Sequence, residues 1–257
     1  MKRIRVRQKH RGFTHLFAVA LLVGLWRVFE RRSRDRIPGQ EGIEDPEVSA
    51  AFEWVSRAPQ MRWMRHFVIS QAVVLQDHGE AVDLGCGAGQ LVLEMARQAP
   101  GLHVTGIDLS EKMLADARQA AQQGGLEDRV DFRLGNVEEI PFPDQSLDLV
   151  ISTASLHHWT DPVKVLNEID RVLKPGGAFC IFDLRRDMAL PFYLMIWVGT
   201  QFVVPAALHR VNEPMASRNA SYTVQELVDL ARQSKLRGGQ VAAGPIWIVL
   251  VGKKSVT

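Results

Sequence analysis

Short apolar runs alternate with amphipathic stretches between residues 80 and 184. Apolar runs of four to seven residues predict buried strands, and stretches with apolar residues every three or four positions predict helices. The predicted strands are 81–84, 104–107, 130–134, 147–152 and 178–182, and the predicted helices are 90–99, 111–123 and 162–174. Strands that alternate with helices in this way predict a parallel sheet with crossover helices.

Residues with local turn and capping preferences agree with these boundaries. Ser110 can cap the second helix, Asp161 before a proline can open the third, and the run Lys-Pro-Gly-Gly at 174–177 is expected to close it. Farther along, Thr223 with a glutamate three residues later forms a capping-box pattern, and 245–251 predicts a last strand.

The segments outside this core predict an N-terminal cover and an insertion. Residues 37–46 are rich in Pro, Gly and acid and predict a linker, and mixed three- and four-residue apolar spacings predict a helical cover at 47–76. A single catalytic domain is thus expected at 47–257, with an insertion at 188–220. The stretch 188–208 contains no charge, and because it lies inside one domain it predicts a lid over an apolar pocket, an interfacial helix or a core helix rather than a single membrane crossing.

Charge is concentrated at the start of the chain. Residues 1–36 hold 11 of the 31 Lys and Arg against two acids, and they flank an apolar run at 16–26 that is short for a bilayer span. The rest of the chain is acidic, which disfavours a nucleic-acid partner. We expect a cytoplasmic protein, with peripheral attachment of 1–36 to the inner face of the cell membrane as an open possibility. The only cysteines, Cys86 and Cys180, predict neither a disulfide framework nor a metal site.

A glycine-rich turn follows the first predicted strand, in the run Asp83-Leu84-Gly85-Cys86-Gly87-Ala88-Gly89. Glycines between a strand and a helix let backbone approach a ligand closely, but the spacing differs from the dinucleotide pattern G-x-G-x-x-G. Asp83 lies inside the strand, where an acid suits a ligand with ammonium and sulfonium groups. Asp108 ends the second strand, where its two oxygens can accept both ribose hydroxyls.

These features together resemble class I S-adenosylmethionine-dependent methyltransferases, especially the small-molecule group that includes the ubiquinone and menaquinone biosynthesis C-methyltransferases. The resemblance covers residues 80–184 and is carried by five ordered segments, 82–91, 104–110, 134–143, 146–162 and 171–177. It implies a Rossmann-like α/β fold, with helices on both faces of a seven-stranded, mostly parallel sheet whose last strand is antiparallel. It also implies S-adenosylmethionine as cofactor, held by Asp83, Gly85, Cys86, Gly87, Gly89, Asp108, Leu109, Met113, Asn136, Val137 and Thr153. Asn136 departs from the commoner Asp, although its amide oxygen can still accept from the adenine amino group.

The segment after the fourth strand carries the candidate catalytic residues. His157 and His158 lie nearest the expected methyl group, and a histidine can act as a general base near neutral pH. The alternative is that both residues only pack the pocket wall or cap the next helix. The Asn/Asp-Pro-Pro-aromatic motif of enzymes that methylate nucleobase amino groups is absent.

The sequence therefore predicts methyl transfer from S-adenosylmethionine to a small, hydrophobic acceptor at O, C or N. Two alternatives remain open at this point. A nicotinamide-dependent reductase is disfavoured by the glycine spacing and by Asp83. A membrane-associated protein that binds the cofactor without catalysis would differ by lacking turnover.

Overall fold

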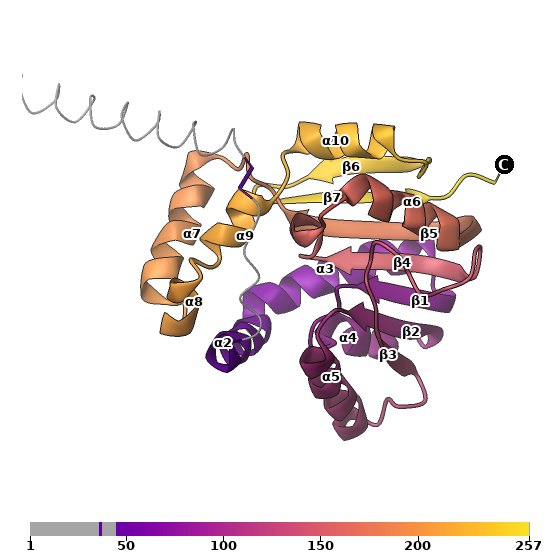
Figure 1. Ribbon diagram of the computed structural model, residues 1–257, viewed down its shortest axis with the longest axis horizontal. Helices are drawn as coiled ribbons and strands as arrows, with labels where there is room; N and C mark the ends of the chain where they lie inside the picture. Colours follow the sequence, from indigo (N-terminus) through magenta and orange to yellow (C-terminus); the bar gives the residue numbers. More distant parts are fainter. Residues whose placement is uncertain (1–35, 38–44, 257) are drawn as a thin grey trace, which may run out of the picture.

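The computed structural model describes residues 36–37 and 45–256. Its centre is a seven-stranded sheet with the strand order β3-β2-β1-β4-β5-β7-β6 (Figure 1). Five strands pair in parallel, and β7 pairs antiparallel with both β5 and β6, so six strands share one direction and the last is reversed. This confirms the predicted Rossmann-like sheet. The strands are β1 (His78–Leu84), β2 (Gly101–Asp108), β3 (Val130–Leu134), β4 (Leu147–Thr153), β5 (Leu173–Leu184), β6 (Gly239–Ala243) and β7 (Trp247–Lys253).

Helices cover both faces of the sheet. One core cluster joins the sheet to α3 (Pro59–Leu75), α4 (Gln90–Gln98) and α5 (Glu111–Gly124), and a second joins the other face to α6 (Pro162–Val172) and α10 (Val224–Gln233). The two clusters use alternate residues of the strands, as in β1, where Ala81 belongs to the first cluster and its neighbour Val82 to the second. The fully buried centres of β1, β4 and β5 explain why the sequence shows continuous apolar runs there.

The boundary between α6 and β5 differs most from the predicted one. The helix expected at 162–174 ends at Val172, because Leu173 is already extended and pairs with Leu147 of β4. The run at 174–177 therefore begins β5 instead of closing the helix, with Gly176 at a φ of +79°. β6, which is mostly exposed and shows no apolar alternation, has no counterpart among the predicted segments.

Short helices gather at the carboxyl end of the parallel strands. They are α2 (Pro46–Ser56), α7 (Leu190–Phe202), α8 (Ala206–Arg210) and α9 (Met215–Ala220) (Figure 1). The 3-10 turn η1 (Leu156–His158), which follows β4 in the chain, contacts both α9 and β5. α2 and α8, which are far apart in sequence, share a small core of their own formed by Val48, Ala51 and Leu208. We call α2, α7 and α8 the end lobe.

The uncharged stretch 188–208 is not one helix. α7 ends at Phe202, and Pro205 precedes the separate helix α8. Thr200 is the one residue of α7 that is buried, so the alternative of a core helix is wrong, whereas the lid and interfacial alternatives fit. Within the described part of the chain, no helix combines the length and apolarity needed to cross a membrane. The predicted anchor at 1–36, except for Arg36, and most of the predicted linker lie outside the described residues.

Candidate functional site

Four strands end beside one another at the edge of the sheet that faces the end lobe. The pairing register places Leu84 opposite Ile107, and Thr153 opposite Phe182. The polar residues at or just before these ends, Asp83, Asp108, Thr153 and Asp183, therefore share one edge. Ligands of open α/β sheets bind at such carboxyl edges.

The glycine turn after β1 is held by the neighbouring strand. The N–H groups of Gly85 and Cys86 both donate to the carbonyl of Ile107, at 2.8 and 2.9 Å. Gly85 has a φ of +73°, and a Cβ there would lie 2.2 Å from Ser155 Oγ. Gly87 has a φ of +53°, and a Cβ added to it would meet no atom within 4 Å, so its backbone borders open space. The turn thus has one wall fixed by packing and another available to a ligand.

Asp108 joins this turn to the end of β2. Its Oδ2 accepts a hydrogen bond from Gly87 N–H at 2.8 Å, and its Oδ1 accepts one from Ser110 N–H at 2.9 Å. A carboxylate has about four acceptor positions, so each oxygen can accept a further donor. The half-buried side chain is thereby fixed in orientation and keeps acceptor positions free, as the predicted ribose contact requires.

Asp83 is a buried acid with incomplete hydrogen bonding. Its side chain is 2% exposed, and Oδ1 has no partner among the described residues. Burial, and to a lesser extent the charge of Asp108, raises the pKa of Asp83 to about 8. An unpaired buried carboxyl group is costly. A cationic ligand group such as an ammonium would remove that cost, which fits the predicted role of this residue.

Other predicted cofactor residues lie near the same edge and differ in their exposure and hydrogen bonding. Leu109 is 62% exposed, whereas Met113 is buried in the first turn of α5, where its N–H donates to Ser110 Oγ. Thr153 Oγ1 is buried and has no hydrogen-bond partner among the described residues. Gly89 begins α4 with a φ of +74°, and a Cβ there would meet the Phe132 ring.

Three predicted residues have local roles that the sequence did not reveal. The Asn136 side-chain oxygen, expected to accept from adenine, already accepts from Glu138 N–H at 2.9 Å, which leaves one lone pair for a ligand. Val137 is half-buried against the second core cluster. Burial and the charge of Asp83 raise the pKa of Cys86, so its thiol is neutral and packs beneath the turn.

His157 is paired with a buried carboxylate. Its Nδ1 lies 2.9 Å from both oxygens of Asp183, which also accepts from the His157 backbone N–H. Burial alone would lower the pKa of His157, but the charge and hydrogen bond of Asp183 outweigh it, and the net shift is upward. Its Nε2 is buried and lacks a partner among the described residues. His157 is therefore held as a donor to Asp183, not as a free base.

His158 has the opposite character. Its side chain is exposed, and the two imidazole rings lie 4.1 Å apart between centroids. Desolvation along the packed side of the ring and the neighbouring His157 lower the pKa of His158 to about 4. His158 is thus neutral at physiological pH and exposed to solvent.

Asp183, Arg36 and Glu213 were not predicted as members of this site. Arg36 donates to the carbonyl of His157 at 2.9 Å, and the buried Glu213, whose pKa is raised by burial, contributes to the upward pKa shift of His157. Asp183 follows an apolar strand in the same way as Asp108, so the same signal could have found it. Arg36 and Glu213 approach only through tertiary folding, and no local signal marks them.

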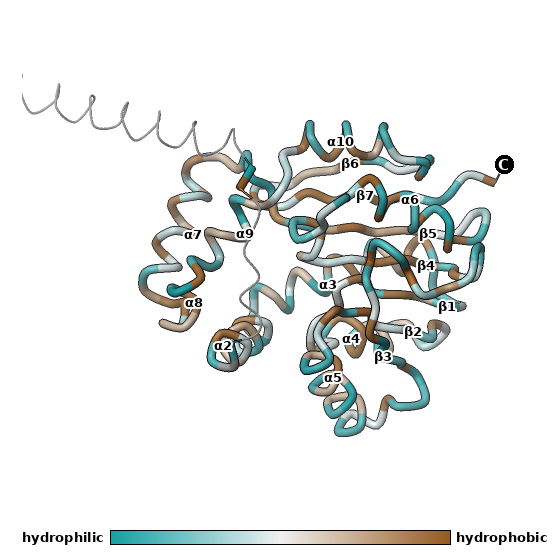
Figure 2. The backbone as a smooth tube through the Cα atoms, viewed as in Figure 1, coloured by the Kyte–Doolittle hydropathy of each residue, from teal (hydrophilic) through white to brown (hydrophobic). Residues whose placement is uncertain are grey.

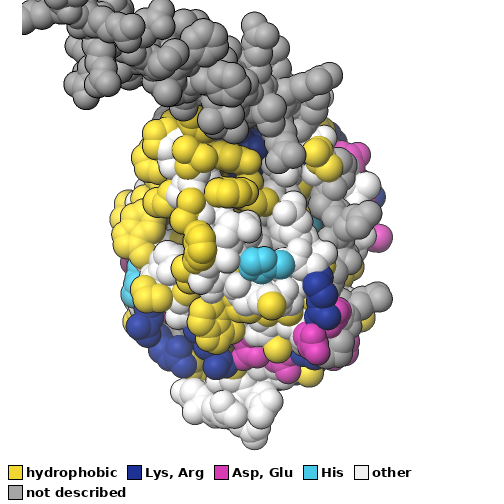
Figure 3. Space-filling model, turned by 90° about the vertical axis from the view of Figure 1, so that its left-hand side faces the viewer, with side chains coloured by type: hydrophobic (Ala, Val, Ile, Leu, Met, Phe, Trp, Pro, Cys, Tyr) yellow, Lys and Arg dark blue, Asp and Glu magenta, His cyan; other side chains and the backbone are white. Residues whose placement is uncertain are grey.

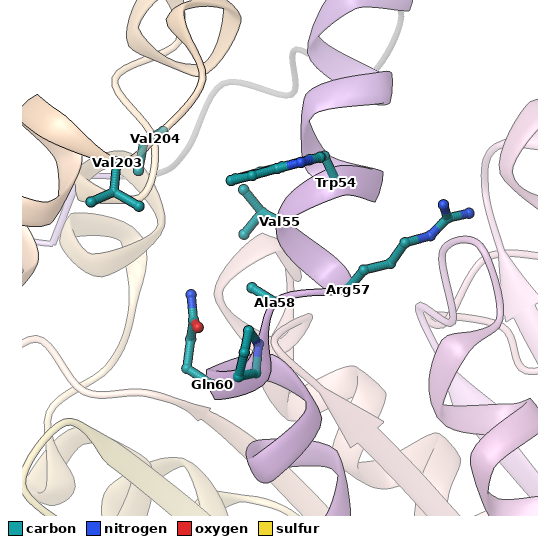
Figure 4. Close-up of a pocket in the computed structure, with 8 residues that line it drawn as sticks. Trp54, Val55, Arg57, Ala58, Gln60, Val203 and Val204 are labelled. Carbon is teal, nitrogen blue, oxygen red and sulfur yellow. The ribbon is translucent and has the colours of Figure 1, made fainter.

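An apolar pocket of about 440 Å³ lies between the end lobe and the start of α3. Figure 4 shows Trp54 and Val55 extending from α2 toward Val203 and Val204, whereas Arg57 points away. The remaining lining comes from Ala58, which precedes α3, and from Pro59 and Gln60, the first two residues of α3. The pocket can accommodate a small apolar group or chain.

Comparison with known proteins identifies the family to which the chain belongs. Residues 75–234 match the model of the methyltransferase domain family, so the chain belongs to that family, and its cofactor is S-adenosylmethionine. Three observations show that the described residues fit this cofactor: the open face of Gly87, the oriented carboxylate of Asp108 and the unpaired carboxyl of Asp83. The comparisons give the reductase alternative no support.

Among curated relatives, a 27-O-demethylrifamycin SV methyltransferase of Amycolatopsis mediterranei is 40% identical over 102 residues, which cover 40% of this chain and 37% of that protein. A demethylmenaquinone methyltransferase of Symbiobacterium thermophilum is 35% identical over 144 residues, covering 56% of this chain and 54% of that protein. The chain therefore aligns with about half or less of the length of these two relatives.

Solved structures show the same fold. A plantazolicin methyltransferase in complex with a desmethyl analogue and SAH has a TM-score of 0.65 at 16% identity, covering 89% of this chain and 99% of that chain. An S-adenosylmethionine-dependent methyltransferase of Aquifex aeolicus has a TM-score of 0.54 at 20% identity, covering 70% of this chain and 84% of that chain. At these identities the likeness concerns the fold alone.

Proposed function

We propose that this protein transfers the methyl group of S-adenosylmethionine to a small, apolar acceptor. The observation that carries the proposal is the pair of carboxyl groups at the strand edge, Asp108 oriented by the glycine turn and Asp83 buried without a full set of partners. An ammonium and a ribose diol, both parts of the cofactor, are the groups that these two acids can recognise.

The cofactor supplies an electrophilic methyl group on a sulfonium, and the protein has to align an acceptor opposite the sulfur and exclude water. In the proposed complex, Asp108 accepts hydrogen bonds from the ribose and Asp83 pairs with the ammonium. Gly87 permits close approach, since no side chain fills the space beside it. A bound cofactor would supply its methyl group to the acceptor and would leave as S-adenosylhomocysteine.

An acceptor O–H, N–H or C–H must also lose a proton. His158 is the candidate base, because it is exposed and neutral at physiological pH, whereas His157 already donates to Asp183. A pKa of about 4 makes His158 a weak base, which suits acceptors with an acidic proton, such as a phenol or an enol. We assign His157 a positioning role through its ring contact with His158.

The apolar character of the acceptor is supported by the pocket beside Trp54 and Val203 and by the names of the relatives. The two relatives reported above are named for a demethylrifamycin and a demethylmenaquinone. We also propose that the protein works on the cytoplasmic side of a membrane, in peripheral contact with it, since an apolar acceptor partitions into lipid.

Isotopic labelling tests the proposed activity. The full chain is incubated with S-adenosylmethionine carrying a deuterated methyl group and with phenolic, quinol and hydroxylated polyketide acceptors. The expected result is a labelled product and an equal amount of S-adenosylhomocysteine. His158→Ala should lower kcat by about 10²–10⁴ while cofactor affinity is retained. Absence of cofactor binding in the folded protein would contradict the proposal, and tight binding of NAD would favour a reductase.

A further inference from the structure

Helix α7 presents an apolar surface that the described part of the protein leaves uncovered. Leu194, Val198 and Phe202 follow one another at four-residue spacing and are 46%, 45% and 82% exposed. Met195 and Trp197, beside this row, are 56% and 45% exposed. A helix of a water-soluble domain ordinarily buries such a row against its core. Figure 2 shows brown and pale colours along most of α7, and Figure 3 shows a hydrophobic area on the same side of the molecule.

The segment that contains this helix lacks negative charge. No Asp or Glu occurs in the sequence between Asp187 and Glu213, a segment that includes both α7 and α8. In the view of Figure 3, magenta acidic side chains lie mainly toward the lower and right-hand edges, whereas the main yellow area is at the upper left. An anionic surface could therefore approach α7 without repulsion from this segment.

The strongly basic segment of the chain is attached close to α7. Ile37 N–H donates to the carbonyl of Asn219 at 3.1 Å, and Arg36 Nε donates to that of Ala220 at 2.6 Å, so residues 36–37 lie against α9. α9 in turn contacts α7. The segment 1–36, which has 11 Lys and Arg and the apolar run at 16–26, thus joins the described fold at α9, the helix that contacts α7.

From this juxtaposition we infer that α7 is a docking surface for an anionic lipid bilayer. The inference rests on the peripheral contact proposed above and names its surface and its lipid partner. The apolar side chains of α7 enter the interface between headgroups and acyl chains, and the basic residues of 1–36 attract the anionic headgroups. A neutral partner protein would explain the exposed row but not the basic segment beside it, so the bilayer accounts for more of the observations.

Vesicle flotation of the full chain tests the inference. With phosphatidylglycerol–phosphatidylcholine vesicles at low salt, the protein should float, and the paired substitution Trp197→Glu with Phe202→Glu should lower the partition coefficient at least tenfold. Val74→Glu is the matched control, because Val74 is an 85% exposed residue at the end of α3, outside the end lobe. This control should float like the wild type. Vesicles of phosphatidylcholine alone should bind the wild type more weakly.

The outcomes distinguish the inference about α7 from the more general proposal of peripheral membrane contact. Equal flotation of the double variant and the wild type would overturn α7 as the surface while leaving peripheral contact in place. Absence of flotation in every arm would overturn both. A wild-type dimer in size-exclusion chromatography that the double variant converts to monomer would mean that a second copy covers α7, and the inference would be wrong. Cofactor affinity, measured by calorimetry without vesicles, should be unchanged in the double variant. A protein that fails to bind the cofactor would thus be distinguished from one that fails to bind the membrane.

Discussion

Each oxygen of Asp108 accepts a backbone N–H from a different side, Gly87 on one and Ser110 on the other. Asp108→Asn would point its NH₂ group at one of these donors, and we expect S-adenosylmethionine binding to weaken by roughly 1.5–3 kcal/mol, the range for hydrogen bonds to charged groups. Calorimetry measures the change. Asp128→Asn, in the exposed turn before β3, is the control. Unchanged affinity in a folded Asp108 variant would remove this residue from the site.

The raised pKa of Asp83 makes the free protein less stable at higher pH. Its carboxyl group ionises near pH 4 in the unfolded chain but only near pH 8 in the folded one. Between these values the folded state binds the extra proton, so its contribution to the free energy of unfolding decreases as pH rises through this window. We measure the free energy of unfolding in urea at pH 5 and at pH 8. The decrease between the two pH values should be smaller for Asp83→Asn than for the wild type, whereas Asp128→Asn should show the wild-type decrease.

Cofactor binding should reverse this protonation. If the ammonium pairs with Asp83, binding near pH 7 releases a proton from the wild type, and Asp83→Asn should not show that release. Calorimetry in buffers of different ionisation enthalpy detects the difference. The same proton release in both proteins would place the ammonium elsewhere.

The His157–Asp183 pair has the opposite pH dependence. A histidine whose pKa is raised on folding stabilises the protein fully below its ordinary value of 6.5, and this contribution is lost as pH rises through the folded pKa. Asp183→Asn leaves the buried imidazole without its counter-charge and should cost about 3–5 kcal/mol of unfolding free energy at pH 6. His158→Ala, on the exposed neighbour, should cost much less. Equal losses in urea unfolding would contradict the pairing.

At the scale of elements, the glycine turn permits a matched comparison. Gly87 and Gly125 have φ values of +53° and +60°, and neither has an atom within 4 Å of an added Cβ. Alanine at either position should cost about 1 kcal/mol of stability through backbone strain. Gly87→Ala should also weaken cofactor binding severalfold, because its methyl group occupies the open space of the turn, whereas Gly125→Ala at the end of α5 should not. Equal affinities by calorimetry would show that the cofactor lies away from Gly87.

The sequence predicted best those elements whose pattern is set by burial. The central strands are buried on both faces and appear as apolar runs, and Ser110, Asp161 and Thr223 cap helices where their patterns indicated. β6 was not predicted, because an exposed strand stabilised by pairing with β7 leaves no apolar signal.

The sequence indicated those site residues that belong to a local pattern, and it missed those whose interaction partners are far away in the sequence. Asp83, Asp108 and the glycines belong to local strand-to-turn patterns, so the sequence indicated them. The pairing of His157 with Asp183 links residues 26 positions apart, and Arg36 reaches His157 across 121 positions. The fold alone brings these groups together, and for this reason the two histidines could not be assigned different protonation states from their sequence.

At the scale of the whole molecule, two helices of the end lobe, α2 and α8, are held together by a core much smaller than the two core clusters of the sheet. That core centres on Val48, Ala51 and Leu208, contributed by α2 and α8. Few buried apolar contacts mean a low free energy of local opening. We expect amide hydrogen exchange in α2 and α8 to be faster than in β1 and β4, whose central residues are fully buried.

Leu208→Ala tests whether the lobe opens as a unit. Truncating a buried leucine costs about 2–5 kcal/mol, which corresponds to at least a roughly 30-fold faster exchange if the loss falls on local opening. The acceleration should appear in both α2 and α8, although about 150 residues separate them in sequence, and β1 and β4 should keep their wild-type rates. Leu194→Ala, on the exposed row of α7, is the control and should change neither. If the sheet accelerates as much as the lobe, the lobe and sheet unfold together, and an acceptor would have to reach the strand edge without separate opening of the lobe.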